Sequence, residues 1–128
     1  MVIDAASLLN KESRKALQLL QGLKGTRLII PQSVIRELGS IKQQFGIFRK
    51  TSDADLALKW IEECMGNTKW WIHIIDCAFP MVEDHILDCA LEYRRKDNVG
   101  QIVLLSDDIV LKIKSMAKGL LCETVQQF

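Results

Sequence analysis

One stretch of this sequence indicates the fold more clearly than any other: Gln101-Ile102-Val103-Leu104-Leu105-Ser106-Asp107-Asp108-Ile109-Val110-Leu111-Lys112. Its apolar first half predicts a buried β-strand that ends before Ser106. Apolar residues then recur at helical spacing as far as Met116, and Gly119 is a helix stop signal. A buried strand that leads through a short polar segment into a helix is the repeating unit of a parallel α/β sheet.

The same alternation of strand and helix continues along the chain. Apolar runs predict further strands at residues 1–3, 27–30 and 70–75, and residues 120–125 could supply a fifth. Apolar residues spaced by three and four predict helices that start near Ser7, Pro31, Ser52 and Ile86, with a surface connection over residues 43–53. We therefore expect a mostly parallel sheet, which binds ligands beyond the carboxyl ends of its strands, where the strand order reverses.

Length and composition fit one domain. The chain has 128 residues, of which 48% are apolar and 26% are charged. We expect a single domain over residues 1–128, cut from a longer protein. No apolar run approaches the roughly 18 residues that span a bilayer, and no secretory signal pattern follows Met1. The net charge of +1 gives no protein-wide field for nucleic acid, so such binding needs a local basic patch.

The cysteines give no metal-binding pattern, because they occur singly in apolar surroundings without the spacing of a zinc site. We expect all of them to be reduced core thiols in an intracellular protein of the nucleus or cytoplasm. These residues are Cys64, Cys77, Cys89 and Cys122.

Acidic residues fall at the ends of the predicted strands or on the helices that follow them. Asp4 ends the first strand, and Asp107 and Asp108 end the fourth. Glu37 lies in the helix after the second strand, and Asp84 opens the helix after the third. If the first and fourth strands are neighbours, Asp4 and Asp108 share one crevice.

Carboxylates that gather at one place need compensation by positive charge, because like charges disfavour each other's ionised form. Oxygen ligands suit Mg²⁺ or Mn²⁺, which can polarise a phosphate and generate hydroxide. The pattern thus indicates phosphodiester hydrolysis. Taken singly, Asp4, Asp107 and Asp108 could be helix caps, Asp84 a favourable charge at a helix start, and Glu37 a solvated surface residue.

Several basic residues are candidates for holding a phosphate backbone near this site. A solvated helix end and loop are the alternative for the same residues. The tryptophans could stack bases, although an indole is more often buried. The basic candidates are Lys42, Arg49, Lys50, Arg94 and Arg95, with Lys96 beside them, and the tryptophans are Trp60, Trp70 and Trp71.

Four blocks of the sequence resemble the PIN domain family, and most closely the PIN domains of nonsense-mediated-decay endonucleases. The blocks are Val2-Ile3-Asp4-Ala5-Ala6-Ser7-Leu8-Leu9, Ile29-Ile30-Pro31-Gln32-Ser33-Val34-Ile35-Arg36-Glu37-Leu38, Glu83-Asp84-His85-Ile86-Leu87-Asp88-Cys89-Ala90-Leu91 and Val103-Leu104-Leu105-Ser106-Asp107-Asp108-Ile109-Val110-Leu111-Lys112. The first block also resembles the PIN region of plant forkhead-associated-domain proteins of the parallel-spindle family, which are linked to meiosis.

This resemblance implies a three-layer α/β/α fold with a twisted, five-stranded parallel sheet. It also implies a metal-dependent endoribonuclease that acts on single-stranded RNA with Mg²⁺ or Mn²⁺. Asp4, Glu37, Asp84 and Asp108 match the acidic quartet of the family. Asp107 could assist or substitute as a metal ligand, and Asp88, one helical turn beyond Asp84, is a second candidate.

One departure from the family pattern lies directly after Asp4. The family usually has a hydroxyl residue there, whereas this chain has Ala5-Ala6. Because alanine cannot orient a carboxylate or a metal-bound water, activity could be weak or lost unless Ser7 supplies the hydroxyl. A protein-interaction or scaffolding module is therefore the competing function. A phosphate-binding or response-regulator-like domain has less support, since the sequence contains no glycine-rich phosphate loop.

Overall fold

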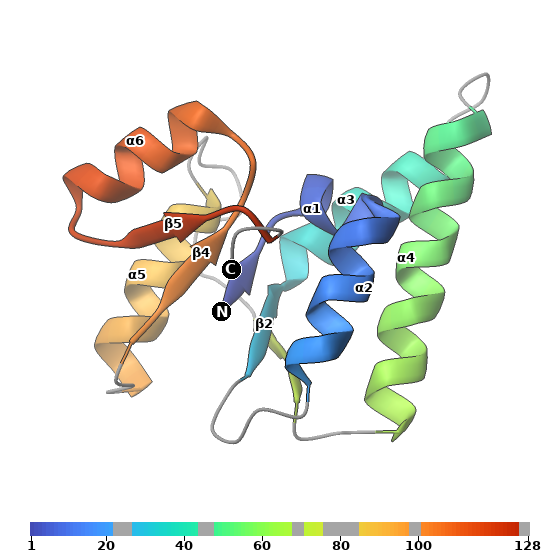
Figure 1. Cartoon of the computed structure of the whole chain (residues 1–128), viewed down its shortest axis with the longest axis horizontal. Coiled ribbons are helices and arrows are strands. Elements are labelled where there is room, and N and C mark those ends of the chain that lie inside the picture. The colour runs from blue at the N-terminus through green and yellow to red at the C-terminus, as the bar shows by residue number, and fades with distance from the viewer. Residues whose placement is uncertain (22–26, 44–47, 68–70, 76–84, 98–100, 126–128) are drawn as a thin grey trace.

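The computed structural model describes residues 1–21, 27–43, 48–67, 71–75, 85–97 and 101–125. The parallel strands β1 (Val2–Ile3), β2 (Leu28–Pro31), β3 (Ile72–Ile75), β4 (Val103–Leu105) and β5 (Leu121–Glu123) form one sheet in the order β3-β2-β1-β4-β5 (Figure 1). The helices of the described residues are α1 (Ala5–Leu9), α2 (Lys11–Leu20), α3 (Gln32–Lys42), α4 (Phe48–Asn67), α5 (His85–Asp97) and α6 (Ile109–Ala117).

The strand order reverses at β1. From β1 the chain builds the sheet outward through β2 and β3, then returns to add β4 and β5 on the other side. Val2 pairs with Leu104 and Ile3 with Leu105, so the residues that follow these strands meet at the same edge. The first and fourth predicted strands are therefore neighbours, which is the condition under which Asp4 and Asp108 could share one crevice, and a switch point lies between their carboxyl ends.

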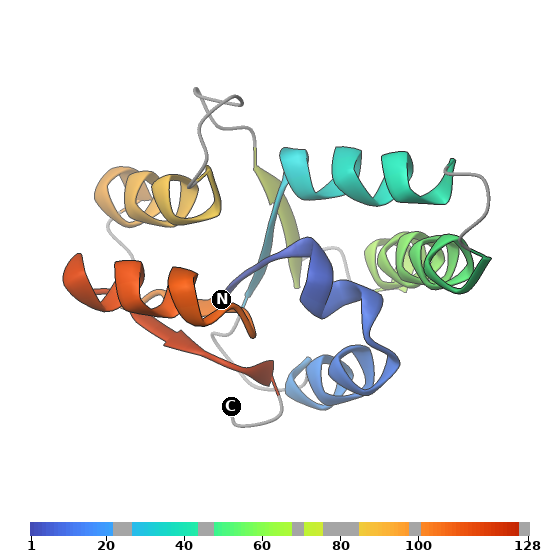
Figure 2. The same ribbon diagram turned by 90° about the horizontal axis from the view of Figure 1, so that it is seen from above.

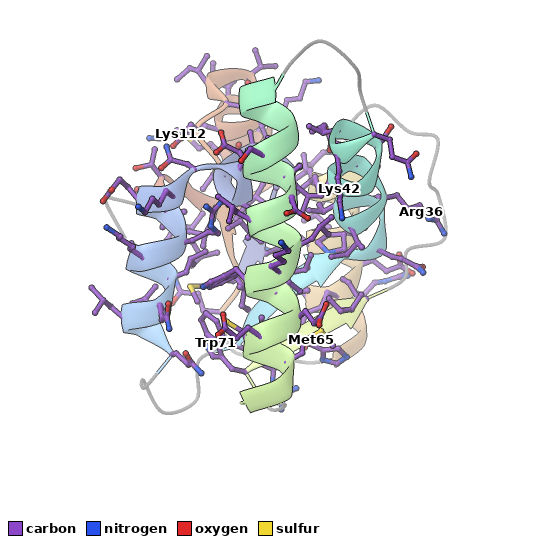
Figure 3. The ribbon with its side chains drawn as sticks, turned by 90° about the vertical axis from the view of Figure 1, so that its right-hand side faces the viewer. Arg36, Lys42, Met65, Trp71 and Lys112 are labelled. Atoms are coloured by element: carbon purple, nitrogen blue, oxygen red, sulfur yellow. The ribbon has the colours of Figure 1, made fainter. Side chains whose placement is uncertain are left out.

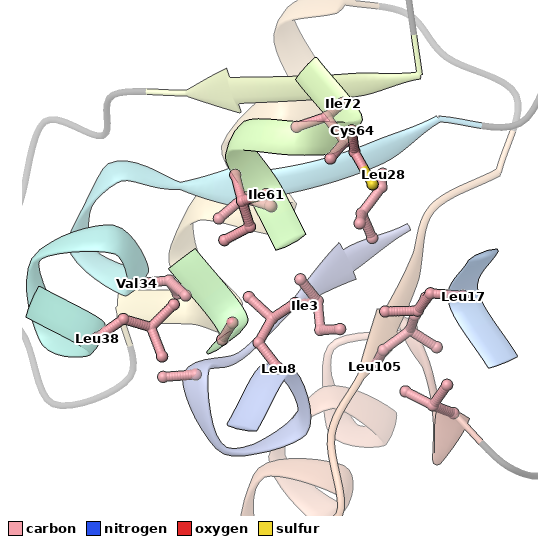
Figure 4. Close-up of a cluster of buried hydrophobic side chains, with 14 of the residues drawn as sticks. Ile3, Leu8, Leu17, Leu28, Val34, Leu38, Ile61, Cys64, Ile72 and Leu105 are labelled. Carbon is pink, nitrogen blue, oxygen red and sulfur yellow. The ribbon is translucent and has the colours of Figure 1, made fainter. Parts of the chain in front are cut away.

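Alternating side chains of the strands enter two hydrophobic cores, one on each face of the sheet. On one face, Ile3, Leu28 and Leu105 pack with residues of α1, α2, α3 and α4 (Figure 4). On the other face, Val2, Ile29 and Leu104 pack with residues of α5 and with Leu111 of α6. Figure 2 shows helices flanking both faces of the sheet, as the three-layer α/β/α prediction requires.

Two helix boundaries differ from the prediction. The helix expected from Ser7 onward is divided into α1 and α2 at Asn10, whose side-chain Oδ1 accepts hydrogen bonds from the N–H groups of Glu12 and Ser13. This arrangement is an N-cap, and it starts a new helix. The helix expected from Ser52 begins at Phe48, so part of the expected surface connection is helical.

The tryptophans and cysteines are also placed by the fold. Trp71 is fully buried and meets Trp60 edge to face, with ring centroids 6.0 Å apart, so the Trp71 indole belongs to the core; Trp70 lies outside the described residues. Cys64 and Cys122 are buried thiols that take part in no disulfide, as expected. Cys89 is bound in a disulfide, so the expectation that every cysteine is reduced is wrong. No helix among the described residues is long and apolar enough to cross a membrane.

Candidate active site

Asp4 lies at the carboxyl end of the central strand β1, where it caps α1. Its Oδ1 accepts a hydrogen bond from the Ser7 N–H at 2.9 Å, and its backbone N–H donates to the Leu105 carbonyl at 3.4 Å. The far end of α1 is held by Arg14, whose buried guanidinium donates to the Leu8 carbonyl at 2.6 Å. Asp4 is thus fixed to β4 on one side and to a short, anchored helix on the other.

Ser106 connects Asp4 to Asp108. The Ser106 hydroxyl donates to Asp4 Oδ2 at 2.5 Å, and Ser106 Oγ in turn accepts a hydrogen bond from the Asp108 N–H at 3.1 Å. The Ser106 N–H donates to the Glu123 carbonyl at 3.0 Å, which ties the loop to β5. Ser106 is only 2% exposed. Hydrogen bonds to a carboxylate are among the stronger ones, so this buried hydroxyl fixes the orientation of the Asp4 carboxylate relative to the backbone of Asp108.

Asp108 caps α6 in the way that Asp4 caps α1. Its Oδ1 accepts a hydrogen bond from the Val110 N–H at 3.0 Å, and the Asp108 side chain is exposed. Its other carboxylate oxygen has no protein partner among the described residues. The capping role expected as an alternative is therefore real for both residues. It is compatible with a site at this edge, because a carboxylate has lone pairs beyond those that a cap uses.

The pKa of the buried Cys122 thiol in β5 depends on burial and on nearby charged side chains. Burial is the main reason why the pKa of the Cys122 thiol is raised, and the negative charge of Asp4 raises this pKa further. The positive charge of Lys112 acts in the opposite direction and lowers the same pKa. The charges of Asp4 and Lys112 therefore act on the same buried thiol in opposite directions.

The remaining acidic candidates are not joined to this network by any contact in the described part of the chain. Glu37 is exposed on α3, Asp107 is exposed in the loop before α6, and Asp88 is exposed in the first turn of α5. Asp84 lies outside the described residues. The structure thus brings Asp4 and Asp108 together through Ser106, and it leaves Glu37 and Asp107 on the surface.

The predicted basic residues lie elsewhere. Lys42 forms an ion pair of 3.0 Å with Asp55 of α4. Arg94 donates a hydrogen bond to the Gly119 carbonyl at 3.4 Å, next to the amino end of β5. Because the strands are parallel, this contact lies at the opposite end of the strands from Asp4. Arg95, the next residue of α5, is exposed. In Figure 3 Lys112 and Lys42 are seen on opposite sides of α4. The side chains of Arg49 and Lys50 lie outside the described part of the structure.

The sequence pattern did not indicate the contact between Ser106 and Asp4. Ser7 was considered as the replacement for the hydroxyl that Ala5 lacks, but the Ser7 hydroxyl is buried without a hydrogen-bond partner in the described residues. Ser7 contacts Asp4 through its backbone N–H instead. The signal for Ser106 was present in the sequence, because a serine directly after a buried strand and two residues before an aspartate can reach the neighbouring strand end.

The donor atoms at this edge suit a hard divalent cation. Mg²⁺ is typically held by one or two carboxylates, with water and phosphate oxygens completing its octahedral shell. Asp4 and Asp108 supply two carboxylates of that kind. Within the described residues no group of three or more His, Cys, Asp or Glu side chains gathers into a metal cluster.

Comparison with known proteins agrees with the architecture. The PIN domain family matches residues 1–126. A curated relative, the FHA domain-containing protein PS1 of Arabidopsis thaliana, is 42% identical over 166 residues; the match covers 100% of this chain and 11% of that protein. Among solved structures, the PIN domain of human SMG5 superimposes with a TM-score of 0.64 at 15% identity, covering 99% of this chain and 93% of that one.

Proposed function

The chain belongs to the PIN domain family, and from that premise we propose that it is a metal-dependent endoribonuclease domain that hydrolyses phosphodiester bonds of single-stranded RNA. PIN domains are generally nucleases that use divalent metal ions. Because this chain spans a small share of its curated relative, we further propose that residues 1–128 act as one module of a longer protein in the nucleus or cytoplasm.

The observation that carries this proposal is the hydrogen-bond chain from Asp4 through Ser106 to Asp108. A protein-interaction module has no need of an Asp4 carboxylate oriented by a buried hydroxyl that is also bonded to the Asp108 backbone, at the switch point of the sheet. The alanine pair after Asp4 was the main argument for a scaffold. Ser106 weakens that argument, because it supplies the hydroxyl contact to Asp4 from the neighbouring strand end.

Asp4 and Asp108 would hold Mg²⁺ or Mn²⁺, and Asp84, Glu37 and Asp107 remain candidates from the sequence. A bound divalent ion supplies Lewis-acid polarisation of the phosphate and a hydroxide nucleophile at neutral pH. The protein's own contribution is orientation: Ser106 fixes one oxygen of Asp4, and the α1 backbone fixes the other.

Lys112 is the basic side chain that supports phosphate binding at this edge. Lys112 is half-buried in the first turn of α6, the helix that Asp108 caps, and its charge acts on the same buried thiol as the charge of Asp4, which supports this assignment. A lysine ammonium binds phosphate as a point charge, without the fixed fork of arginine. We therefore assign Lys112 to contact with the RNA backbone, where it favours binding irrespective of base sequence.

The test is cleavage of a labelled single-stranded RNA in Mn²⁺ by the parent protein, Asp4→Asn and Asp108→Asn. Asparagine caps a helix about as well as aspartate, so both substitutions remove the charge and keep α1 and α6 capped. Asp55→Asn is the matched control, because Asp55 pairs with Lys42 and Lys59 on α3 and α4. We expect a loss of about a hundredfold or more in the two site variants and none in the control. Full cleavage by both site variants would exclude this site.

A further inference from the structure

Every exposed residue of α6 is apolar. Ile109, Ile113 and Met116 are 65%, 61% and 64% exposed, Val110 is 54% exposed, and Ala117 in the last turn is exposed as well. Because successive residues of a helix are turned by about 100°, these five side chains fall on one contiguous face. Single exposed apolar residues are ordinary, but a contiguous set on one helix face marks an interaction site.

The packing of the domain does not account for this face. The opposite side of α6 carries Leu111, which contacts the core, and the fully buried Ser115, whose hydroxyl donates to the Leu111 carbonyl at 2.7 Å. A surface helix normally turns its apolar stripe toward the core. In α6 the stripe points outward instead. In Figure 1 the helix lies at the margin of the molecule, beside the edge strand β5.

The apolar positions of the outer face are symmetric about Ile113. Ile109 and Ala117 each lie four residues from Ile113, and Val110 and Met116 each lie three residues from it. Since helix surfaces form ridges along positions four and three residues apart, two apolar ridges cross at Ile113. If a second α6 lies antiparallel on this face with the two Ile113 side chains in the middle, every apolar position meets an apolar position. Such a pattern fits a reversed copy of itself, as a contact around a two-fold axis requires.

The charges at the two ends of α6 are reversed about the same residue. Asp108 lies five residues before Ile113, and Lys118 lies five residues after it. Asp107 extends the acidic end, and all three charged side chains are exposed. In an antiparallel pair the acidic end of each helix lies beside the basic end of the other, so opposite charges meet twice. A parallel pair would bring like charges together, so the charges select the antiparallel orientation.

The lysines within the helix do not oppose this pairing. Lys112 and Lys114 are half-buried at the two borders of the apolar face. The charge of Lys112 acts on the buried thiol of Cys122, and Lys114 already has an interaction partner. Neither lysine therefore places a fully exposed charge on the face itself.

Both ends of α6 are fixed, so the apolar face is presented on a rigid element. Asp108 caps the first turn. At the other end Gly119 has a φ of 73°, its N–H donates to the Met116 carbonyl at 3.1 Å, and the Leu120 N–H donates to the Ser115 carbonyl at 2.9 Å. This double bond pattern with a left-handed glycine is a Schellman motif. A surface that is already ordered loses little conformational entropy when it binds.

We propose that the outer face of α6 is the interface between two copies of this chain, packed antiparallel around a two-fold axis at Ile113. Ile109 faces Ala117 of the second copy, and Asp107 lies beside Lys118 of the second copy. A second copy is the occupant because one helix supplies both the symmetric apolar pattern and its own charge complement, and an unrelated partner requires neither. One helix from each copy makes a small contact, so we expect a dissociation constant of about 10–100 µM. This inference does not depend on the nuclease activity.

Cysteine cross-linking tests the symmetry of the contact. A disulfide needs Cα atoms within about 7 Å of each other. Ile113→Cys should therefore form a covalent dimer with itself under mild oxidation. The two Ile109 positions would lie about 12 Å apart along the helices, so Ile109→Cys and Ala117→Cys should cross-link when mixed and neither should do so alone. Leu19→Cys is the matched control, because Leu19 is 83% exposed on α2, and it should give no covalent dimer.

Sedimentation velocity over about 1–200 µM protein measures the strength of the contact. We expect Ile113→Glu to weaken dimerisation about tenfold or more, and Leu19→Glu to leave it unchanged. Asp107→Lys and Lys118→Asp should each weaken it about threefold. The double variant, in which the two charges are exchanged, should regain the affinity of the parent protein.

The proposal is overturned if the parent protein stays monomeric over this range, or if its dimer survives Ile113→Glu. It is also overturned if Ile113→Cys forms no more covalent dimer than Leu19→Cys. Self-cross-linking of Ile109→Cys would show that the helices are parallel, which contradicts the proposed arrangement. Asp4→Asn should dimerise like the parent protein, so a failure of the nuclease proposal would not affect the result.

Discussion

Replacing Ser106 with alanine tests the connection between Asp4 and Asp108. The substitution removes a charged hydrogen bond of 2.5 Å to Asp4 and the acceptor of the Asp108 N–H at 3.1 Å. A hydrogen bond to a charged group contributes about 1.5–3 kcal/mol, and a neutral one about 0.5–1.5 kcal/mol. Because Asp4 is half-buried, water replaces part of the lost interaction. We therefore expect the free energy of unfolding to fall by about 2 kcal/mol.

Urea unfolding measures this difference. With a denaturant slope of about 2 kcal/mol per molar, the midpoint should fall by about 1 M. The control is Ser7→Ala, which removes a buried hydroxyl that has no partner in the described structure. Because no hydrogen bond is lost, its free energy of unfolding should change by less than about 0.5 kcal/mol. Ser106→Thr retains the hydroxyl and should recover most of the lost stability. Equal midpoints for Ser106→Ala and Ser7→Ala would refute the reasoning.

Further predictions concern the core, the alkaline stability and the RNA contact. Leu8→Ala should cost about 2–5 kcal/mol in thermal or urea unfolding, because Leu8 is fully buried, whereas Leu19→Ala on the surface should stay within about 0.5 kcal/mol. Burial raises the pKa of the Cys122 thiol in the folded protein above its value in the unfolded chain, so ionisation of this thiol favours unfolding. The stability that the neutral thiol contributes is fully present below the pKa of the unfolded chain, and it is lost as pH rises through the pKa of the folded protein. The stability of the parent relative to Cys122→Ala should accordingly decline between about pH 8 and 10, and a constant difference would contradict the shift. Lys112→Ala should weaken RNA binding about fivefold and lower its salt dependence, while Lys42→Ala, whose ammonium is paired with Asp55, should have little effect.

The sequence was sufficient to predict the strands and their parallel arrangement, because the apolar runs of the buried strands differ plainly from the helical spacing between them. It could not place the break at Asn10, since a capping asparagine in an exposed helical pattern looks like any polar surface residue. The disulfide at Cys89 was missed for a related reason. Spacing along the chain does not show which sulfur atoms the fold brings together.

The candidate site was predictable only in part. The proximity of Asp4 and Asp108 follows from strand order and register, which the position of each residue at a strand end already suggests. The link through Ser106 depends on side-chain geometry between two strands that are distant in sequence. The outward direction of Ile109, Ile113 and Met116, which are exposed on α6, could not be foreseen either. The periodicity of a helix shows that it has an apolar face but not which way that face points.

The measurement that tests the central claim most directly is a calorimetric titration of Mn²⁺ into the parent protein and into Asp4→Asn. A two-carboxylate site at the switch point predicts binding by the parent protein and its loss in Asp4→Asn, with the Asp4→Asn protein still folded because asparagine preserves the cap of α1. The absence of binding in either folded protein would contradict the metal site, and equal binding in both would place the ion somewhere other than at Asp4.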